Sequence, residues 1–163
     1  MADITLLEEL DAGRDAFLEA LSDVDAALVT VSGVVDDWSV RDVVVHVAAW
    51  NEHGSSALEL AAAGRGQEFA YARDQTDAMN EGFLAEAQAT SPMDALRREA
   101  ESFDAFRARI AALPPSLFAE RLGNGDTVEA VIRYDGPEHY AEHTEHLRSW
   151  FGHETDDDDD SGV

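Results

Sequence analysis

Apolar residues recur at spacings of three and four along most of this chain, and this period constrains the fold more than any other feature. The first such stretch lies near the N-terminus, where acidic residues and Arg14 separate the apolar positions. Its apolar members are Leu6, Leu7, Leu10, Phe17, Leu18 and Leu21. Because residues three and four apart share one face of an α-helix, the pattern predicts an amphipathic helix that ends near Ser22.

Start and stop signals divide the rest of the chain into further helices. Ser39-Val-Arg-Asp42 fits a capping box with Ser39 as the N-cap, and Gly64 is placed to end that helix. Ser91-Pro92 is a second start signal, with Pro at the first helical position. The other predicted features are a weaker helix over 74–89, a stop at Pro114-Pro115, a start at Asp126 with Glu129 three residues on, a kink or break at Gly136-Pro137, and a last helical segment over 137–152.

These segments predict an all-α protein: a four-helix bundle with one or two short extra helices and a long connection. At 163 residues the chain has the length of one domain with a buried core. We expect the bundle to occupy residues 1–152. Residues 153–163 contain five consecutive Asp and are expected to form a disordered acidic tail.

The charge of the chain is extreme, because 35 acidic residues stand against 11 basic ones, all Arg, for a net charge of −24. Binding to nucleic acid or to anionic lipid uses basic side chains that displace counterions, so the composition predicts no nucleic-acid partner and no membrane partner. No run of 18 apolar residues is present, no secretory signal pattern is visible, and cysteine is absent. We therefore expect a cytoplasmic protein without disulfides or thiolate metal ligands.

Four of the six histidines mark a candidate metal site. His139, His143 and His146 lie close together near the C-terminus, and residues at i and i+4 of a helix can bind one ion. His46 lies far upstream, on the apolar stripe of another predicted helix. Imidazoles without Cys favour Zn²⁺, Ni²⁺, Fe²⁺ or Cu²⁺ over Ca²⁺ or Mg²⁺, and three protein ligands leave one coordination position for water.

Each ligating imidazole needs a partner for its other ring nitrogen, and Asp42, Glu138 and Glu142 are candidates. Simpler interpretations stand beside these. A His-x-x-x-His pair arises by chance, a lone buried histidine is usually a core residue with one hydrogen bond, and acids on this chain are usually solvated. The nearby aromatic residues either line a pocket or belong to the core; they are Trp38, Trp50, Tyr140 and Trp150.

Two motifs resemble the DinB-like superfamily and, within it, the ClbS/DfsB branch of four-helix bundle proteins. They are Trp38-Ser-Val-Arg-Asp-Val-x-x-His46-x-x-x-Trp50 and His139-Tyr-x-Glu-His143, supported by Asp77-x-x-Asn80 and by the helix between Ser91 and Pro114. The resemblance extends roughly over residues 5–151. It implies that His46, His139 and His143 bind a divalent transition metal (Zn, Ni or Fe). It leaves His146 as a neighbour of a ligand or a bystander.

Two kinds of function are open, and the resemblance implies the first of them. The first is a metal-dependent enzyme that uses water or a low-molecular-weight thiol such as mycothiol or bacillithiol against an electrophilic small molecule, as a hydrolase or thiol S-transferase in detoxification. The second is a non-catalytic bundle that binds or sequesters a small molecule. The expected partner is therefore a small-molecule substrate, joined in the first case by a low-molecular-weight thiol. Helix stripes alone leave a homodimer open.

Overall fold

The computed structural model describes residues 4–157, with side chains as far as Phe151. Its principal elements are α1 Ile4–Ser22, α2 Val40–Ala62, α3 Thr76–Gln88, α4 Pro92–Ala112, α5 Val128–Asp135 and α6 Pro137–Asp157. Short 3₁₀ turns lie in the connections between them. Every regular element within residues 4–157 is helical, which confirms the all-α prediction. Among these helices none combines the length and the apolar character that a membrane span requires.

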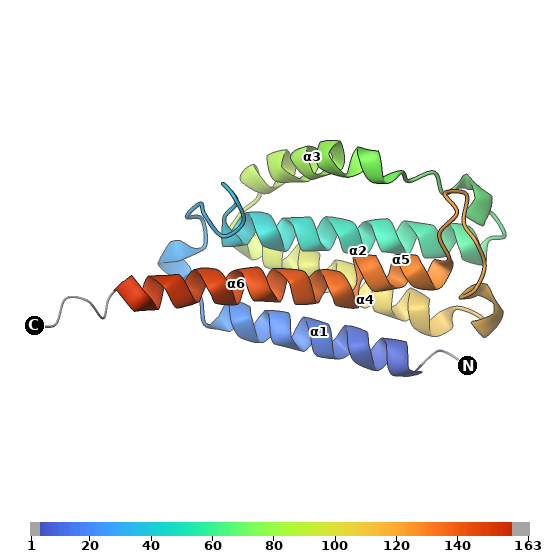
Figure 1. The fold of residues 1–163 in the computed structure, drawn as a ribbon, viewed down its shortest axis with the longest axis horizontal. Helices are drawn as coiled ribbons and strands as arrows, with labels where there is room; N and C mark the ends of the chain where they lie inside the picture. The colour runs from blue at the N-terminus through green and yellow to red at the C-terminus, as the bar shows by residue number, and fades with distance from the viewer. Residues whose placement is uncertain (1–3, 158–163) are drawn as a thin grey trace, which may run out of the picture.

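The bundle consists of α1, α2, α4 and the end-to-end pair α5–α6 (Figure 1). The most extensive contacts join α2 to α4 and α1 to α6. Large side chains from all of these helices fill the core, among them Phe17, Leu58, Phe106, Ile132 and Tyr140. The remaining helix, α3, runs along α2 on the outside of the bundle (Figure 1). The predicted four-helix bundle with an extra helix is therefore confirmed.

Two long connections pack against each other at one end of the bundle. Residues 63–75 join α2 to α3, and residues 113–127 join α4 to α5. Gly123 N donates to Gly66 O at 3.0 Å, and Gln67 Nε2 donates to Arg121 O at 3.0 Å. These hydrogen bonds fix the end of α2 relative to the start of α5, which leads into the histidine-bearing helix.

The two strongest helix starts form as predicted. Asp42 N donates to Ser39 Oγ at 3.2 Å, and Ser39 N donates to Asp42 Oδ2 at 2.8 Å, which completes a capping box on α2. Ser91 Oγ caps α4 by accepting a hydrogen bond from Asp94 N at 3.1 Å, and Pro92 occupies the first position of that helix. The α2 cap fixes where the helix begins and therefore which of its faces carries His46.

Two predicted helix boundaries, the start of α5 and the end of α2, are wrong by one residue. Thr127 rather than Asp126 caps α5, because the Asp126 carboxylate instead accepts a hydrogen bond from Tyr134 Oη at 3.1 Å. Ala63 is the C-cap of α2, and Gly64 follows it with a φ of +72°. This left-handed conformation favours glycine, so Gly64 stands one position beyond the cap.

Gly136 and Pro137 divide the last rod into two abutting helices, one of the two forms predicted. Pro137 has no N–H to donate and occupies the first position of α6. Gly136 N donates to Ile132 O at 2.9 Å, and a Cβ on Gly136 would lie 2.6 Å from that oxygen. Only glycine fits such a close approach, so this junction depends on the Gly-Pro pair.

The last helix extends past its predicted end at 152 and reaches Asp157. The acidic tail predicted over 153–163 therefore begins within α6. Residues 158–163 of that predicted tail lie outside the described residues. The boundary between bundle and tail at 152 stays a prediction.

Candidate metal centre

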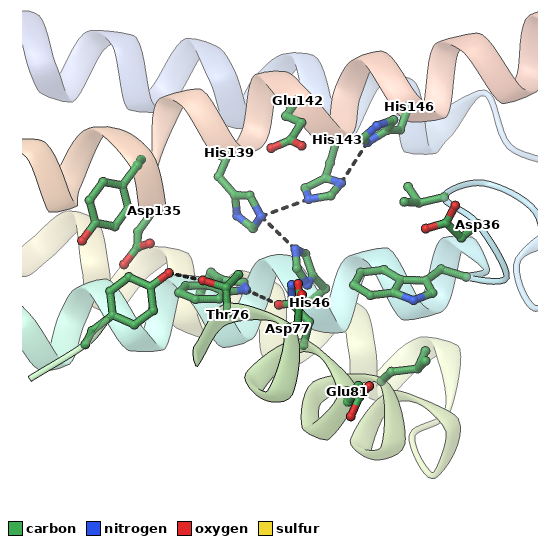
Figure 2. A pocket seen from close by; sticks show the side chains of 17 residues that line it. Asp36, His46, Thr76, Asp77, Glu81, Asp135, His139, Glu142, His143 and His146 are labelled. Carbon is green, nitrogen blue, oxygen red and sulfur yellow. Dashed lines mark hydrogen bonds between the residues drawn. The ribbon is translucent and has the colours of Figure 1, made fainter. Parts of the chain in front are cut away.

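Three imidazole rings from two helices meet at one point. His46 comes from α2, and His139 and His143 come from α6 (Figure 2). His139 Nε2 lies 2.9 Å from His46 Nε2 and 3.0 Å from His143 Nε2, and potential ligand atoms of the three rings all lie within 4.8 Å of one another. The structure thus brings together the three histidines singled out from the sequence.

Helix register and burial explain this meeting. His139 and His143 are four residues apart on α6, so their rings project from the same face. His46 belongs to the buried side of α2 and is 6% exposed, while His143 is 4% exposed. The indole of Trp38 packs edge-on against the His46 ring, with centroids 4.7 Å apart. The rings are therefore held by packing from both helices.

The donor set fits a divalent transition metal. An imidazole nitrogen carries either one proton or one lone pair, so His139 Nε2 cannot form normal hydrogen bonds with both His46 and His143. A single cation, by contrast, accepts the lone pairs of all three rings. Within the described residues the group contains these three side chains and no fourth His, Cys, Asp or Glu. Such a site leaves a coordination position for water or another ligand.

Burial keeps the three imidazoles neutral. It lowers the pKa of His46 from 6.5 to about 3, with smaller effects from the charges of His143 and His146. It lowers the pKa of His143 to about 2, with smaller effects from His139 and His146. Burial, and then the charge of His46, also place the pKa of His139 well below its usual range. Neutral imidazole is the form that binds metal.

The second ring nitrogens of His46 and His139, their Nδ1 atoms, lack the carboxylate partners considered from the sequence. His46 Nδ1 and His139 Nδ1 are buried and have no hydrogen-bond partner among the described residues. The Asp42 carboxylate is used in the α2 capping box. Glu138 and Glu142 are exposed, in line with the simpler interpretation of these acids as solvated. The histidines are therefore oriented by packing more than by hydrogen bonding.

His146 lies one turn beyond His143 on α6. Its Nδ1 is 3.3 Å from His143 Nδ1, the ring nitrogen that points away from the meeting point (Figure 2). His146 therefore contacts a candidate ligand from behind and is not a fourth member of the group.

The three histidines open into a cavity of about 590 Å³ between α2, α3 and α6. Four aromatic residues line it, namely Trp38, Trp50, Tyr71 and Tyr134. Five carboxylates also line it, namely Asp36, Asp77, Glu81, Asp135 and Glu142. Two of the four aromatic residues noted from the sequence, Trp38 and Trp50, thus face a pocket. The other two belong to the core: Tyr140 is fully buried, and Trp150 packs against the core.

A buried His–Asp pair beside the cavity was not identified from the sequence. His53 Nδ1 lies 2.7 Å from Asp135 Oδ2. Asp135 is 2% exposed, and burial raises its pKa from 3.8 to about 6, although the interaction with His53 acts in the opposite direction. Register is the signal that points to this pair. Asp135 precedes His139 by four residues and His53 follows His46 by seven, so each shares a helical face with a candidate ligand.

A second polar cluster, also missed, lies in the core behind His139 and His143. Arg14 donates two hydrogen bonds to Glu99, at 2.9 and 3.0 Å, and Tyr140 Oη donates a third at 2.8 Å. Asn51 Nδ2 donates to Tyr140 Oη at 2.8 Å. This cluster joins α1, α2, α4 and α6, and it anchors the helix that carries the two histidines.

Comparisons with known proteins show the fold and the family. The family described as mycothiol maleylpyruvate isomerase N-terminal domain matches residues 7–147. An uncharacterised protein from Escherichia coli UTI89 is similar, with a TM-score of 0.80 and 17% identity over 94% of this chain and 95% of that one. The colibactin self-resistance protein ClbS, solved in complex with a dsDNA, has a TM-score of 0.77 and 16% identity over 91% of this chain and 94% of that one. The search of curated proteins gave no match. The ClbS-type bundle expected from the motifs is confirmed.

The ClbS complex corrects one prediction made from composition. The net charge of −24 predicts no nucleic-acid partner, yet a protein with this fold is solved with dsDNA bound. The exclusion of nucleic acid is therefore wrong. Its physical weakness is that nucleic-acid binding depends on where basic side chains are placed on the surface, whereas net charge is summed over the whole chain.

Proposed function

Because the chain belongs to the mycothiol maleylpyruvate isomerase N-terminal domain family, within the DinB-like superfamily, we propose that it is a metal-dependent enzyme of a detoxification type. His46, His139 and His143 are the proposed ligands of a divalent transition metal, Zn, Ni or Fe. The proposed reaction is the attack of water or of a low-molecular-weight thiol on an electrophilic small molecule.

The observation that carries this proposal is the meeting of three neutral Nε2 atoms at the wall of a cavity. The contacts of 2.9 and 3.0 Å share one nitrogen of His139, which one cation explains better than two hydrogen bonds. The adjoining cavity of about 590 Å³ is within the size range of small-molecule sites. A metal position and space for a substrate therefore lie side by side.

A divalent metal at this position would act as a Lewis acid that lowers the pKa of a coordinated water or thiol. The residues of the chain supply the remainder of the site. The buried histidines offer lone pairs at neutral pH, and Trp38 and Trp50 pack edge-on against the His46 ring, with centroids 4.7 and 6.4 Å away. Asp135, held by His53, presents a carboxyl that can accept or release a proton at the cavity wall.

The description of the family supports a thiol cosubstrate. The name of the family includes mycothiol, a low-molecular-weight thiol. The chain has no Cys, so a nucleophilic sulfur must come from a second molecule. Free thiols are kept reduced in the cytoplasm, and we include that location in the proposal.

A non-catalytic bundle that binds or sequesters a small molecule is the second candidate, and one observation favours it. Metal-ligating histidines almost always donate their other ring N–H to a carboxylate, a carbonyl or water. His46 Nδ1 and His139 Nδ1 have no carboxylate or carbonyl partner in the described part of the chain. The same cavity would then hold its ligand without chemistry.

Turnover separates the two functions. Untagged protein loaded with Zn²⁺ is incubated with a panel of epoxides and α,β-unsaturated carbonyl compounds, with and without mycothiol, and products are followed by mass spectrometry. The enzyme proposal predicts turnover that is lost on chelation and in His143→Ala. Glu101→Gln changes an exposed acid of α4 that does not line the cavity, so it should keep full activity. The binding function predicts a raised melting temperature with ligand, no turnover, and no dependence on metal.

A further inference from the structure

The wall of the cavity is acidic, and no arginine of the described residues pairs with its carboxylates. Five of its 17 lining residues are carboxylates, and none is an Arg (Figure 2). None of these five carboxylates forms an ion pair with an Arg within the described residues. Asp135 pairs with His53, and the other four carboxylates have no ion-pair partner within the described residues, so the cavity carries an excess of negative charge.

Eight arginines of the described residues form ion pairs, and none of these pairs involves a carboxylate of the cavity wall. These arginines are Arg14, Arg41, Arg65, Arg97, Arg98, Arg107, Arg109 and Arg133. Helix α3 shows the contrast within one element. Glu86 lies 2.9 Å from Arg98, whereas Asp77 and Glu81, which line the cavity, have no Arg partner in the described structure.

Asp135 makes this charge part of a rigid wall. Its carboxylate is 2% exposed and is held by His53 at 2.7 Å. The His53 ring is itself enclosed by Trp50, Phe69 and Tyr71, with ring centroids 4.8, 5.2 and 4.8 Å away. Figure 2 shows Asp135 beside His139 on the cavity side of its helix. A carboxylate this buried cannot turn away from a ligand to relieve repulsion.

Aromatic rings complete a wall suited to a cation. Trp38, Trp50, Tyr71 and Tyr134 line the same cavity. Aromatic faces attract ammonium groups, and carboxylates attract them by charge. A negatively charged ligand meets like charges instead, because five carboxylates outnumber the two positive charges that a divalent metal would bring.

We infer that this cavity selects its ligand by charge: it accepts an amine-bearing, positively charged small molecule and rejects a dicarboxylate. Maleylpyruvate, which the description of the family names, is a dicarboxylate. This chain therefore takes a substrate of a different charge class. The inference rests on the proposed function in treating the cavity as the substrate site, and it narrows the electrophile to a cationic one.

Benzylamine, benzyl alcohol and benzoate test this inference, because they share one ring and differ in charge. Each is titrated into the untagged full chain, metal-free and with Zn²⁺, and the NMR signal of the Trp50 indole N–H reports binding. The titrations are made in about 0.15 M salt, which screens charges farther than about 8 Å from the ligand, so that the carboxylates of the cavity dominate the result. We expect benzylamine to bind at least about tenfold more tightly than benzoate in both forms, with benzyl alcohol between them.

Variants show whether the lining carboxylates cause the preference. The double variant Asp77→Asn, Glu81→Gln removes two exposed charges from α3 and should reduce the affinity ratio of benzylamine to benzoate several-fold. Asp135→Asn should do the same if it folds. Glu101→Gln removes a charge outside the cavity and should leave the ratio unchanged.

The outcomes distinguish the inference from the proposed function. An unchanged ratio in the double variant, benzoate binding as tight as that of benzylamine to the metal-free protein, or no binding of benzylamine overturns the inference. Failure of Zn²⁺ to bind, with the benzylamine preference intact, overturns the metal-dependent function and leaves the charge selection standing.

Discussion

Trp50 Nε1 donates a hydrogen bond to Asn80 Oδ1 at 2.9 Å, and this bond joins α2 to α3 beside the candidate metal centre. Helix α3 is otherwise weakly attached, because Ala87 is its one fully buried residue and its ion pair through Glu86 is exposed. Segments with few buried apolar contacts open most readily. Since α3 forms one wall of the cavity, its opening should control access to the histidines.

Loss of the Trp50–Asn80 bond should loosen α3 and leave the bundle folded. In Asn80→Ala, a hydrogen bond worth about 1 kcal/mol is lost, so amide hydrogen exchange over 76–88 should accelerate about fivefold. Amides of α1 and α4 should keep their protection. Glu86→Gln, which weakens an exposed ion pair with Arg98, is the control and should have a smaller effect. Unchanged exchange of α3 in Asn80→Ala would contradict this role for the bond.

Tyr140→Phe tests the buried cluster behind the histidines. The change removes the hydroxyl that joins Asn51 to Glu99. It leaves buried polar groups without a partner, so the free energy of unfolding should fall by about 1–3 kcal/mol in urea denaturation. The control Glu68→Gln weakens an exposed pair with Arg65 and should cost less than about 1 kcal/mol. If both variants lose the same stability, the cluster does not anchor α6.

Gly54 and Gly82 provide a matched pair of glycines in helices. A Cβ on Gly54 would lie 2.8 Å from Phe106 Cζ and 3.3 Å from Asp135 Cβ, whereas a Cβ on Gly82 meets nothing within 4 Å. Gly54→Ala should therefore destabilise the protein by about 1–3 kcal/mol through overpacking. Gly82→Ala should stabilise it by about 0.5–1 kcal/mol through helix propensity. Thermal denaturation of both variants measures this, and equal effects would show that α2 and α4 do not approach as closely as described.

The metal-free protein should lose stability as the pH falls. The pKa values of about 3 for His46 and about 2 for His143 lie below the ordinary 6.5, so the unfolded chain takes up protons first. The contribution of the two neutral histidines to the free energy of unfolding is complete above about pH 6.5. It is lost progressively as the pH falls toward about 3. Asp135, with its pKa raised to about 6, acts in the opposite direction, because the folded protein binds its proton first.

A variant isolates the histidine contribution to that pH dependence. Urea unfolding of His143→Gln in EDTA, between about pH 6 and pH 5, should show a slope smaller by about one proton per molecule than that of the unaltered protein. Identical slopes would mean that His143 is not buried as a neutral ring.

The helices and the three histidines could be predicted from the sequence because their signals are local or periodic. Ser39 and Asp42 are three residues apart, and the chemistry of a capping box fixes their relationship. His139 and His143 follow from helix register alone. The pairing of His46 with them, across 93 residues, was a hypothesis based on its place on an apolar stripe, and the family resemblance then selected His46, His139 and His143 as the ligand set.

The rest of the site depends on packing that no local signal encodes. His53 and Asp135 are 82 residues apart, and they meet because α5 docks against α2 before the junction at Gly136. Glu99 is one of 35 acidic residues, and its 1% exposure follows only from the assembled bundle. The charge of the cavity could not be predicted for the same reason, since net charge does not show which carboxylates line one cavity or lack an arginine partner.

Metal content tests the central proposal most directly. Elemental analysis is made on the untagged protein, because histidines in a tag bind metal, and on His143→Ala and His146→Ala. The proposal predicts about one transition metal per chain, lost in His143→Ala, and retained in His146→Ala with an affinity weaker by up to about 10–100-fold. Protein that remains metal-free after incubation with Zn²⁺ or Ni²⁺, with no change in melting temperature, would contradict the proposed metal-dependent function.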